Sequence, residues 1–151
     1  MTTPDFMLRV GKPAGRKLTW DLPVPHVGAS AHYLYDISGN KHLGLREGSR
    51  LFLFRGSSVP TAGLFALATC EVRDDQTIAA EKEHDAFVRV RFEAVLEEPI
   101  TIDTLAAEGR EAESAMRKFR NDGNLQMRRL SDVESTALIS VFANAMTGHQ
   151  A

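Results

Sequence analysis

The sequence has little of what marks several large classes of protein. Its 151 residues include a single cysteine, Cys70, which excludes an intramolecular disulfide and a cysteine-rich zinc site. No apolar run approaches the roughly 18 residues that span a bilayer, and Met1 to Val10 lacks the apolar core of a signal peptide. The sequence therefore predicts a cytoplasmic protein with no membrane partner.

A strong excess of one charge is also absent. The chain carries 18 lysines and arginines against 20 aspartates and glutamates, which argues against indiscriminate coating of nucleic acid. Its apolar content of 43% and charged content of 25% are those of an ordinary globular domain and exclude disorder. The length and the lack of repeats predict one domain over residues 1–151.

Recognisable cofactor motifs are missing too. There is no G-x-G-x-x-G and no G-x-x-x-x-G-K-[ST], and the loop Gly11–Gly15 has the wrong length and contains Pro13 where an N–H donor is needed. The five histidines lack the spacing that places two imidazoles on one helix face. We therefore expect no cofactor and no metal, and we interpret Cys70 as a buried structural thiol.

Apolar periodicity predicts an α+β fold with a small, strongly curved sheet or barrel flanked by short helices. Alternation is clearest over Ala86–Val95, where Val88, Val90 and Phe92 interleave with charged residues. The strands are expected at 6–10, 50–55, 62–73 and 86–95, with the second and third forming a hairpin. Residues 21–48, rich in proline and glycine, are expected to be mostly loop with a short helix near His26–Tyr33.

Helix signals gather in the last third of the chain. Thr101 is a candidate cap for a short helix that stops at Gly109, and a second helical segment is expected near Glu111–Phe119. Ser131 and Glu134 form a capping box that opens a final helix. Its apolar face is predicted from the three- and four-residue spacing of Val133, Ala137, Leu138, Val141, Phe142 and Ala145.

The most suggestive chemistry is aromatic. Trp20, Tyr33 and Tyr35 fall in the segment expected to be loop, where large rings either plug the edge of a core or line a pocket. With Asp36 and Ser38 beside them, such rings could hold a planar ligand such as a flipped nucleobase. Residues 1–20 and 110–129 are basic and 74–98 acidic, which fits either a positive face or a mixed solvated surface.

Four segments, taken in order, resemble the EVE domain of the PUA-like superfamily. They are Leu45-Arg-Glu-Gly-Ser-Arg-Leu-Phe-Leu-Phe-Arg-Gly-Ser57, Ala62-Gly-Leu-Phe-Ala-Leu-Ala68, Phe87–Ile100 with its "Leu-x-x-Pro-Ile" ending, and Phe119–Gln126 followed by Leu130–Glu134. The resemblance covers residues 43–146. The chain departs from the family pattern where Ser49 replaces a turn-stabilising Asp, where Ala68 replaces a glycine, and where the first strand lacks a Trp.

The resemblance implies a PUA-like pseudo-barrel of about five or six strands with a pocket on one side. Relatives in that superfamily read modified nucleotides, and EVE-like modules are associated with modification-dependent restriction. The implied function is non-catalytic recognition of 5-methylcytosine, or a related modified cytosine, flipped out of DNA. The implied partners are this DNA and a nuclease or translocase effector, which would be carried on a longer chain or a separate subunit.

The residues expected to act fall into two sets, with no catalytic residue and no metal ligand among them. The base-binding candidates are Trp20, Tyr33, Tyr35, Asp36, Ser38, Arg55, Ser57 and Phe119. The candidates for contacts with the nucleic-acid backbone are Lys12, Arg16, Lys17, Arg117, Arg120, Asn121 and Asn124.

Three other functions remain open from the sequence. The same pocket could bind RNA, because PUA-like folds also serve RNA modification. A small hydrolase of a modified nucleoside, as in the related ASCH domains, would need a lysine, a carboxylate and a hydroxyl, for which Lys41 or Lys17, Asp36 and Thr19 are candidates. A protein-interaction domain is the third alternative.

Overall fold

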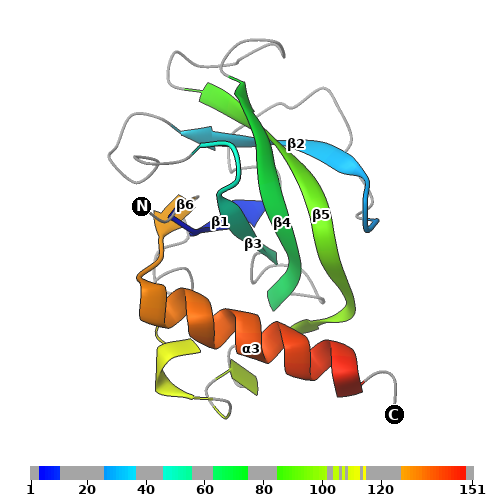
Figure 1. Ribbon diagram of the computed structural model, residues 1–151, viewed down its shortest axis with the longest axis vertical. Helices are drawn as coiled ribbons and strands as arrows, with labels where there is room; N and C mark the ends of the chain where they lie inside the picture. Colours follow the sequence, from blue (N-terminus) through cyan, green and yellow to red (C-terminus); the bar gives the residue numbers. More distant parts are fainter. Residues whose placement is uncertain are drawn as a thin grey trace.

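The fold is seen in a computed structural model. It describes residues 4–10, 26–36, 46–55, 63–74, 85–101, 104–105, 107, 109–112, 114 and 127–148. The elements are β1 (Phe6–Val10), β2 (Ser30–Asp36), β3 (Arg50–Arg55), β4 (Gly63–Asp74), β5 (Asp85–Ile100), β6 (Met127–Arg129) and α3 (Asp132–Gly148). Residues 104–105, 107, 110–112 and 114 are also helical, and they lie beneath α3 in Figure 1.

The predicted strands and the predicted last helix are confirmed, and two elements differ from expectation. The helix expected near His26–Tyr33 is wrong, because Ser30–Asp36 forms β2 and pairs with β5 over seven residues. A long partner strand offers this segment a full ladder of hydrogen bonds, which overrides a weak local preference. The short β6 went unpredicted because three residues carry no readable periodicity.

The strands form one mixed, curved sheet in the order β2-β5-β4-β3-β1-β6 (Figure 1). The β1–β3 pair is parallel and the other pairs are antiparallel, so β3 and β4 form the expected antiparallel pair. Register shifts interrupt the β3–β4 ladder once and the β4–β5 ladder three times. Such bulges increase twist and bending, which accounts for the curvature of the two longest strands. The α+β class and the curved sheet are confirmed.

Both faces of the central strands are buried. We call the residues on one face the first core cluster: Phe6, Leu8, Ala31, Leu51, Leu53, Phe65, Ala66, Ala68, Cys70, Val88, Val90 and Phe92. The second core cluster joins the opposite face to α3 and the short helical segments: Met7, Phe52, Phe54, Leu64, Leu96, Ile100, Leu105, Ala112, Leu130, Leu138, Val141 and Phe142. Burial on both faces explains why β3 is an unbroken apolar run rather than an alternating one.

The start of α3 is fixed by the predicted capping box. The Glu134 amide donates to Ser131 Oγ at 3.2 Å, and the Ser131 amide donates to Glu134 Oε1 at 3.0 Å. Glu134 and the neighbouring Ser135 are therefore buried, whereas Val133 is 62% exposed. The expectation that Val133 belongs to the buried face of this helix is wrong, because the polar residues of the first turn face the sheet.

Two turns with the same design precede β2 and β3. In the turn Arg46–Ser49, the Ser49 amide donates to the Arg46 carbonyl at 2.9 Å, and Gly48 has a φ of 91°. In the turn that begins at His26, the Ala29 amide donates to the His26 carbonyl at 3.0 Å, with a φ of 86° at Gly28. A positive φ at the third position is typical of a type II turn, which favours glycine there.

Each turn is tied to the neighbouring strand. The Gly28 amide donates to the Phe92 carbonyl of β5 at 2.8 Å, and the Gly48 amide donates to the Cys70 carbonyl of β4 at 2.9 Å. Ser49 stabilises its own turn, since its hydroxyl accepts the Arg46 amide at 3.2 Å. A hydroxyl thus serves as the turn's acceptor at this position.

Candidate nucleic-acid interface

The described residues include part of the predicted base-binding set. The backbone of Tyr33, Tyr35 and Asp36 lies in β2, and that of Arg55 ends β3. The other base-binding candidates lie outside the described residues: Trp20, Ser38, Ser57 and Phe119. So do all the candidates for backbone contacts, Lys12, Arg16, Lys17, Arg117, Arg120, Asn121 and Asn124, and the hydrolase candidates Lys17, Thr19 and Lys41.

The two tyrosines lie in a strand rather than in a loop. In the β2–β5 ladder, Tyr33 pairs with Val88, Tyr35 with Ala86 and Asp36 with Asp85. β2 is one of the two edge strands of the described sheet, so its second hydrogen-bonding side has no strand partner among the described residues. The expectation of a loop at these positions is corrected: a regular edge strand fixes the spacing of both tyrosines.

Alternation along β2 decides which positions share a face. Positions 31, 33 and 35 lie on one side of the strand, because successive residues of a strand alternate between faces. Ala31, on that side, is buried in the first core cluster, and Val88, the register partner of Tyr33, is fully buried there. The tyrosine positions therefore belong to the face of the sheet that does not carry α3.

Arg55 lies at the other end of the sheet. It pairs with Gly63, and the next residue of β4, Leu64, pairs with Ile100 at the end of β5. Tyr35 pairs instead with Ala86 near the start of β5, roughly 45 Å of extended strand away. Figure 1 shows the end of β3 and the start of β5 well separated. The strand register thus groups Tyr33, Tyr35 and Asp36 without Arg55.

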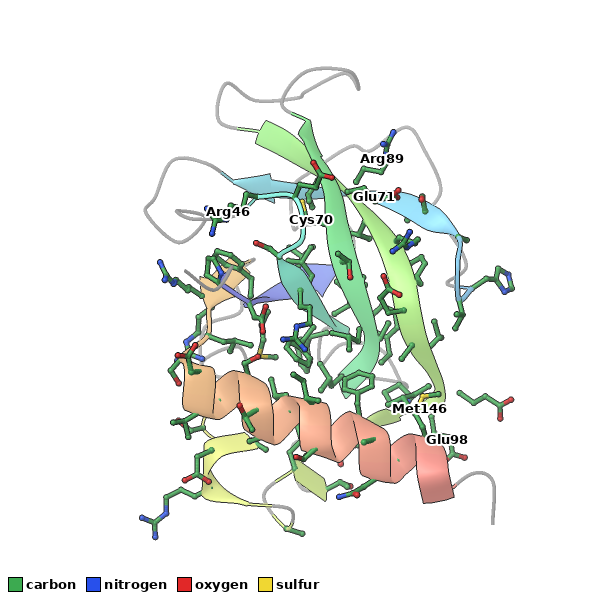
Figure 2. The ribbon with its side chains drawn as sticks, in the orientation of Figure 1. Arg46, Cys70, Glu71, Arg89, Glu98 and Met146 are labelled. Atoms are coloured by element: carbon green, nitrogen blue, oxygen red, sulfur yellow. The ribbon has the colours of Figure 1, made fainter. Side chains whose placement is uncertain are left out.

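A polar cluster that sequence reasoning missed joins β2, β4 and β5. Ser30 Oγ donates a hydrogen bond to Glu71 Oε1, and Arg89 Nε lies 3.8 Å from the same oxygen. Figure 2 shows Glu71 and Arg89 near each other on adjacent strands. Farther along β5, Arg91 pairs with Glu93 at 3.1 Å. The sequence signal was the alternation of these charges in β5, but only the strand pairing reveals Glu71 as a partner.

A second polar cluster fastens the start of α3 to the sheet. Arg128 of β6 forms an ion pair with Glu134 at 2.9 Å. Burial alone would raise the pKa of Glu134, but hydrogen bonds from Arg128 and Ser131 and the charge of Arg128 outweigh it and lower that pKa from its ordinary value of 4.5. Asp5 accepts hydrogen bonds from Ser135 and from the Arg50 amide, the latter at 3.2 Å.

Three arginines stay available for an anionic partner. Arg46, Arg110 and Arg129 are exposed and take part in none of the ion pairs that involve described residues. Arg46 lies in the turn before β3 and is labelled in Figure 2. By contrast, Arg50 is paired with Asp5 at 3.5 Å. The described surface is therefore mixed in charge, with exposed arginines in separate elements.

Metal and thiol chemistry has no support in the described part of the chain. No group of three His, Cys, Asp or Glu side chains gathers there in a way that could hold a metal ion. Cys70 is 1% exposed within β4, which confirms its predicted burial. In the same segments, no helix has the length and apolar character needed to cross a membrane.

These features define an α+β protein built on a curved, mixed sheet that packs one face against a C-terminal helix. The NMR structure of Rpa0253 from Rhodopseudomonas palustris has this fold, with a TM-score of 0.60 over 93% of each chain. The two sequences are 16% identical, so the likeness shows the shared fold alone. No protein-family model and no curated protein matches the sequence.

Proposed function

We propose that this protein is a non-catalytic module that recognises a modified cytosine, 5-methylcytosine or a relative, flipped out of DNA. The observation that carries the proposal is the grouping of Tyr33, Tyr35 and Asp36 at the end of one edge strand. Tyr33 and Tyr35, at alternate positions, share a face, and Asp36 ends the strand on the opposite face. The resemblance to EVE domains supports the same function.

The chemistry of these residue types suits a cytosine. A tyrosine ring stacks on the face of an unpaired base, and such stacking is worth about 1–3 kcal/mol per base. A methyl group adds about 1–3 kcal/mol in an apolar pocket, so discrimination between modified and unmodified DNA should be modest.

Extruding a base costs a few kcal/mol, which contacts with phosphates must offset. The exposed Arg46 is a described candidate for such a contact, and the basic residues of segments 1–20 and 110–129 are further candidates. Because the proposed module lacks catalytic residues, its biological effect requires a nuclease or translocase partner, on the same longer chain or on a separate subunit.

The test is a binding panel on oligonucleotides of one sequence. We expect duplex DNA with 5-methylcytosine or 5-hydroxymethylcytosine to bind roughly tenfold more tightly than unmodified DNA. Replacement of Tyr35 by Ala should abolish this preference while non-specific binding remains. Val27→Ser is the matched control, because Val27 is an exposed residue of the turn that precedes the same strand.

Equal affinity for all the DNA duplexes would refute the proposal. A modified single-stranded RNA of the same sequence belongs in the panel, because tighter binding to it would replace DNA by RNA as the target. Circular dichroism of each variant distinguishes a lost contact from a lost fold.

A further inference from the structure

A shallow groove of about 400 Å³ lies along the first turns of α3. Among the described residues it is lined by Glu111, Asp132, Val133, Thr136 and Ala137. Glu111 belongs to the helical residues 110–112, and the other four belong to α3. Figure 1 shows this helical segment beneath the N-terminal half of α3. The groove therefore separates two helical elements that share the second core cluster.

Most of the surface that lines the groove is apolar. Val133 is 62% exposed, although its helix buries Leu138, Val141 and Phe142 against the sheet. This exposure has a structural cause, since the capping box and the Arg128 ion pair turn Glu134 toward the sheet and Val133 outward. Thr136 and Ala137 follow Val133 at the three- and four-residue spacings of one helix face. A ligand in the groove would thus cover an aliphatic surface.

The charges beside this surface favour a cation. Glu111 and Asp132 are exposed and enter none of the ion pairs between described residues, whereas Glu134 is already paired with Arg128. An anion at the start of α3 is disfavoured, because Ser131 Oγ already accepts the Glu134 amide and two carboxylates stand close by. Arg110 precedes Glu111, but consecutive residues of a helix point about 100° apart.

We propose that this groove is the docking site for a short segment of a partner protein that presents a lysine or arginine beside an aliphatic side chain. The cation would pair with Glu111 and Asp132 while the aliphatic group covers Val133. α3 packs on the face of the sheet opposite the positions of Tyr33 and Tyr35. The identification of this partner as the effector of a base reader rests on the proposed function. The docking of the segment in this groove does not depend on that function.

The test uses the full chain, isotopically labelled, with three synthetic peptides. The first has an arginine between two leucines, the second replaces the arginine by glutamate, and the third replaces both leucines by serine. We expect only the first to shift the amide resonances of Val133, Thr136 and Ala137 in a saturable way. Val133→Ser should weaken that binding roughly fivefold, and Asp132→Asn by a similar factor at low salt.

Val27→Ser is the control, because Val27 is equally exposed but lies in the turn before β2. The affinity of the Val27→Ser variant for the first peptide should equal that of the wild type. The Val133→Ser variant should keep the preference for modified DNA.

Equal shifts from all three peptides, or shifts that avoid α3, would overturn the proposal. If the protein forms a dimer that dissociates in the Val133→Ser variant, the proposal is also overturned, because the occupant of the groove is then a second copy of the chain. A failed DNA panel with a positive peptide result would refute the base reader alone.

Discussion

Gly63 shows how one residue can depend on a distant part of the chain. It begins β4 with a φ of 139°, and a Cβ atom placed there would lie 2.6 Å from the carbonyl oxygen of Ile100. The start of β4 and the end of β5 therefore approach each other closely only because this position lacks a side chain. Gly48 also has a positive φ, but a Cβ atom there would meet nothing within 4 Å.

This difference makes a prediction at the residue scale. Gly63→Ala should lower the free energy of unfolding by about 2–4 kcal/mol, because it adds both backbone strain and a clash with β5. Gly48→Ala should cost about 1–2 kcal/mol, since it adds strain alone. Urea unfolding of the two variants measures both values. An equal loss of stability in the two would show that the close approach to Ile100 is not a constraint.

Residues whose partners are near in sequence were predictable. Ser131 and Glu134 were identified as a capping box because both hydrogen bonds span three positions. The special role of Gly63 was not predictable, because it depends on the distant Ile100. The hydrogen bond between Ser30 of β2 and Glu71 of β4 was not predictable either. The exposure of Val133 was missed for a related reason: Arg128 and Asp5, which draw the first turn of α3 inward, lie outside the helix.

At the scale of elements, α3 is held to the sheet by packing and by a buried charge. Phe142 of the helix contacts Phe52 of β3 with ring centroids 6.0 Å apart, and the Arg128–Glu134 pair fixes the first turn to β6. Because the pKa of Glu134 is lowered in the folded protein, its charged form stabilises the fold. That stabilisation is present above the unfolded pKa and is lost as the pH falls through the folded pKa.

Glu134→Gln tests this contribution while it preserves the capping box, since glutamine also accepts the Ser131 amide. The variant should be less stable than the wild type by about 1–3 kcal/mol near neutral pH, because Arg128 loses its counter-charge. The gap should close as the pH falls below the ordinary value of 4.5, where the carboxylate of the wild type takes up its proton. Urea unfolding across this range is the measurement; a gap independent of pH would contradict the account.

The strands illustrate how far periodicity predicts a fold. β3 and β5 were located from the sequence because one is a continuous apolar run and the other alternates. β2 was mistaken for loop and helix because its partner residues lie 49 to 61 positions away in the sequence, and pairing with that strand decides its conformation. Its correction changes the candidate site, since an edge strand spaces Tyr33 and Tyr35 by a fixed geometry that a loop would not provide.

At the scale of the whole molecule, the two faces of the sheet carry different features. One face carries α3 and the proposed groove for a partner protein, and the other carries the positions of Tyr33 and Tyr35. The sequence predicted the fold class but not which candidate residues come together, because Arg55 and Tyr35 are separated by the register of strands far apart in the chain.

The most direct test of the proposed base recognition is the fluorescence of a 2-aminopurine placed next to the modified cytosine in a DNA duplex. Extrusion of the cytosine removes its stacking on the 2-aminopurine, so we predict that saturating protein raises the fluorescence when the cytosine is methylated. The rise should be much smaller with unmodified cytosine, and Tyr35→Ala should abolish it. Tight binding to methylated DNA with no change in fluorescence, or the same rise for both duplexes, would contradict the account.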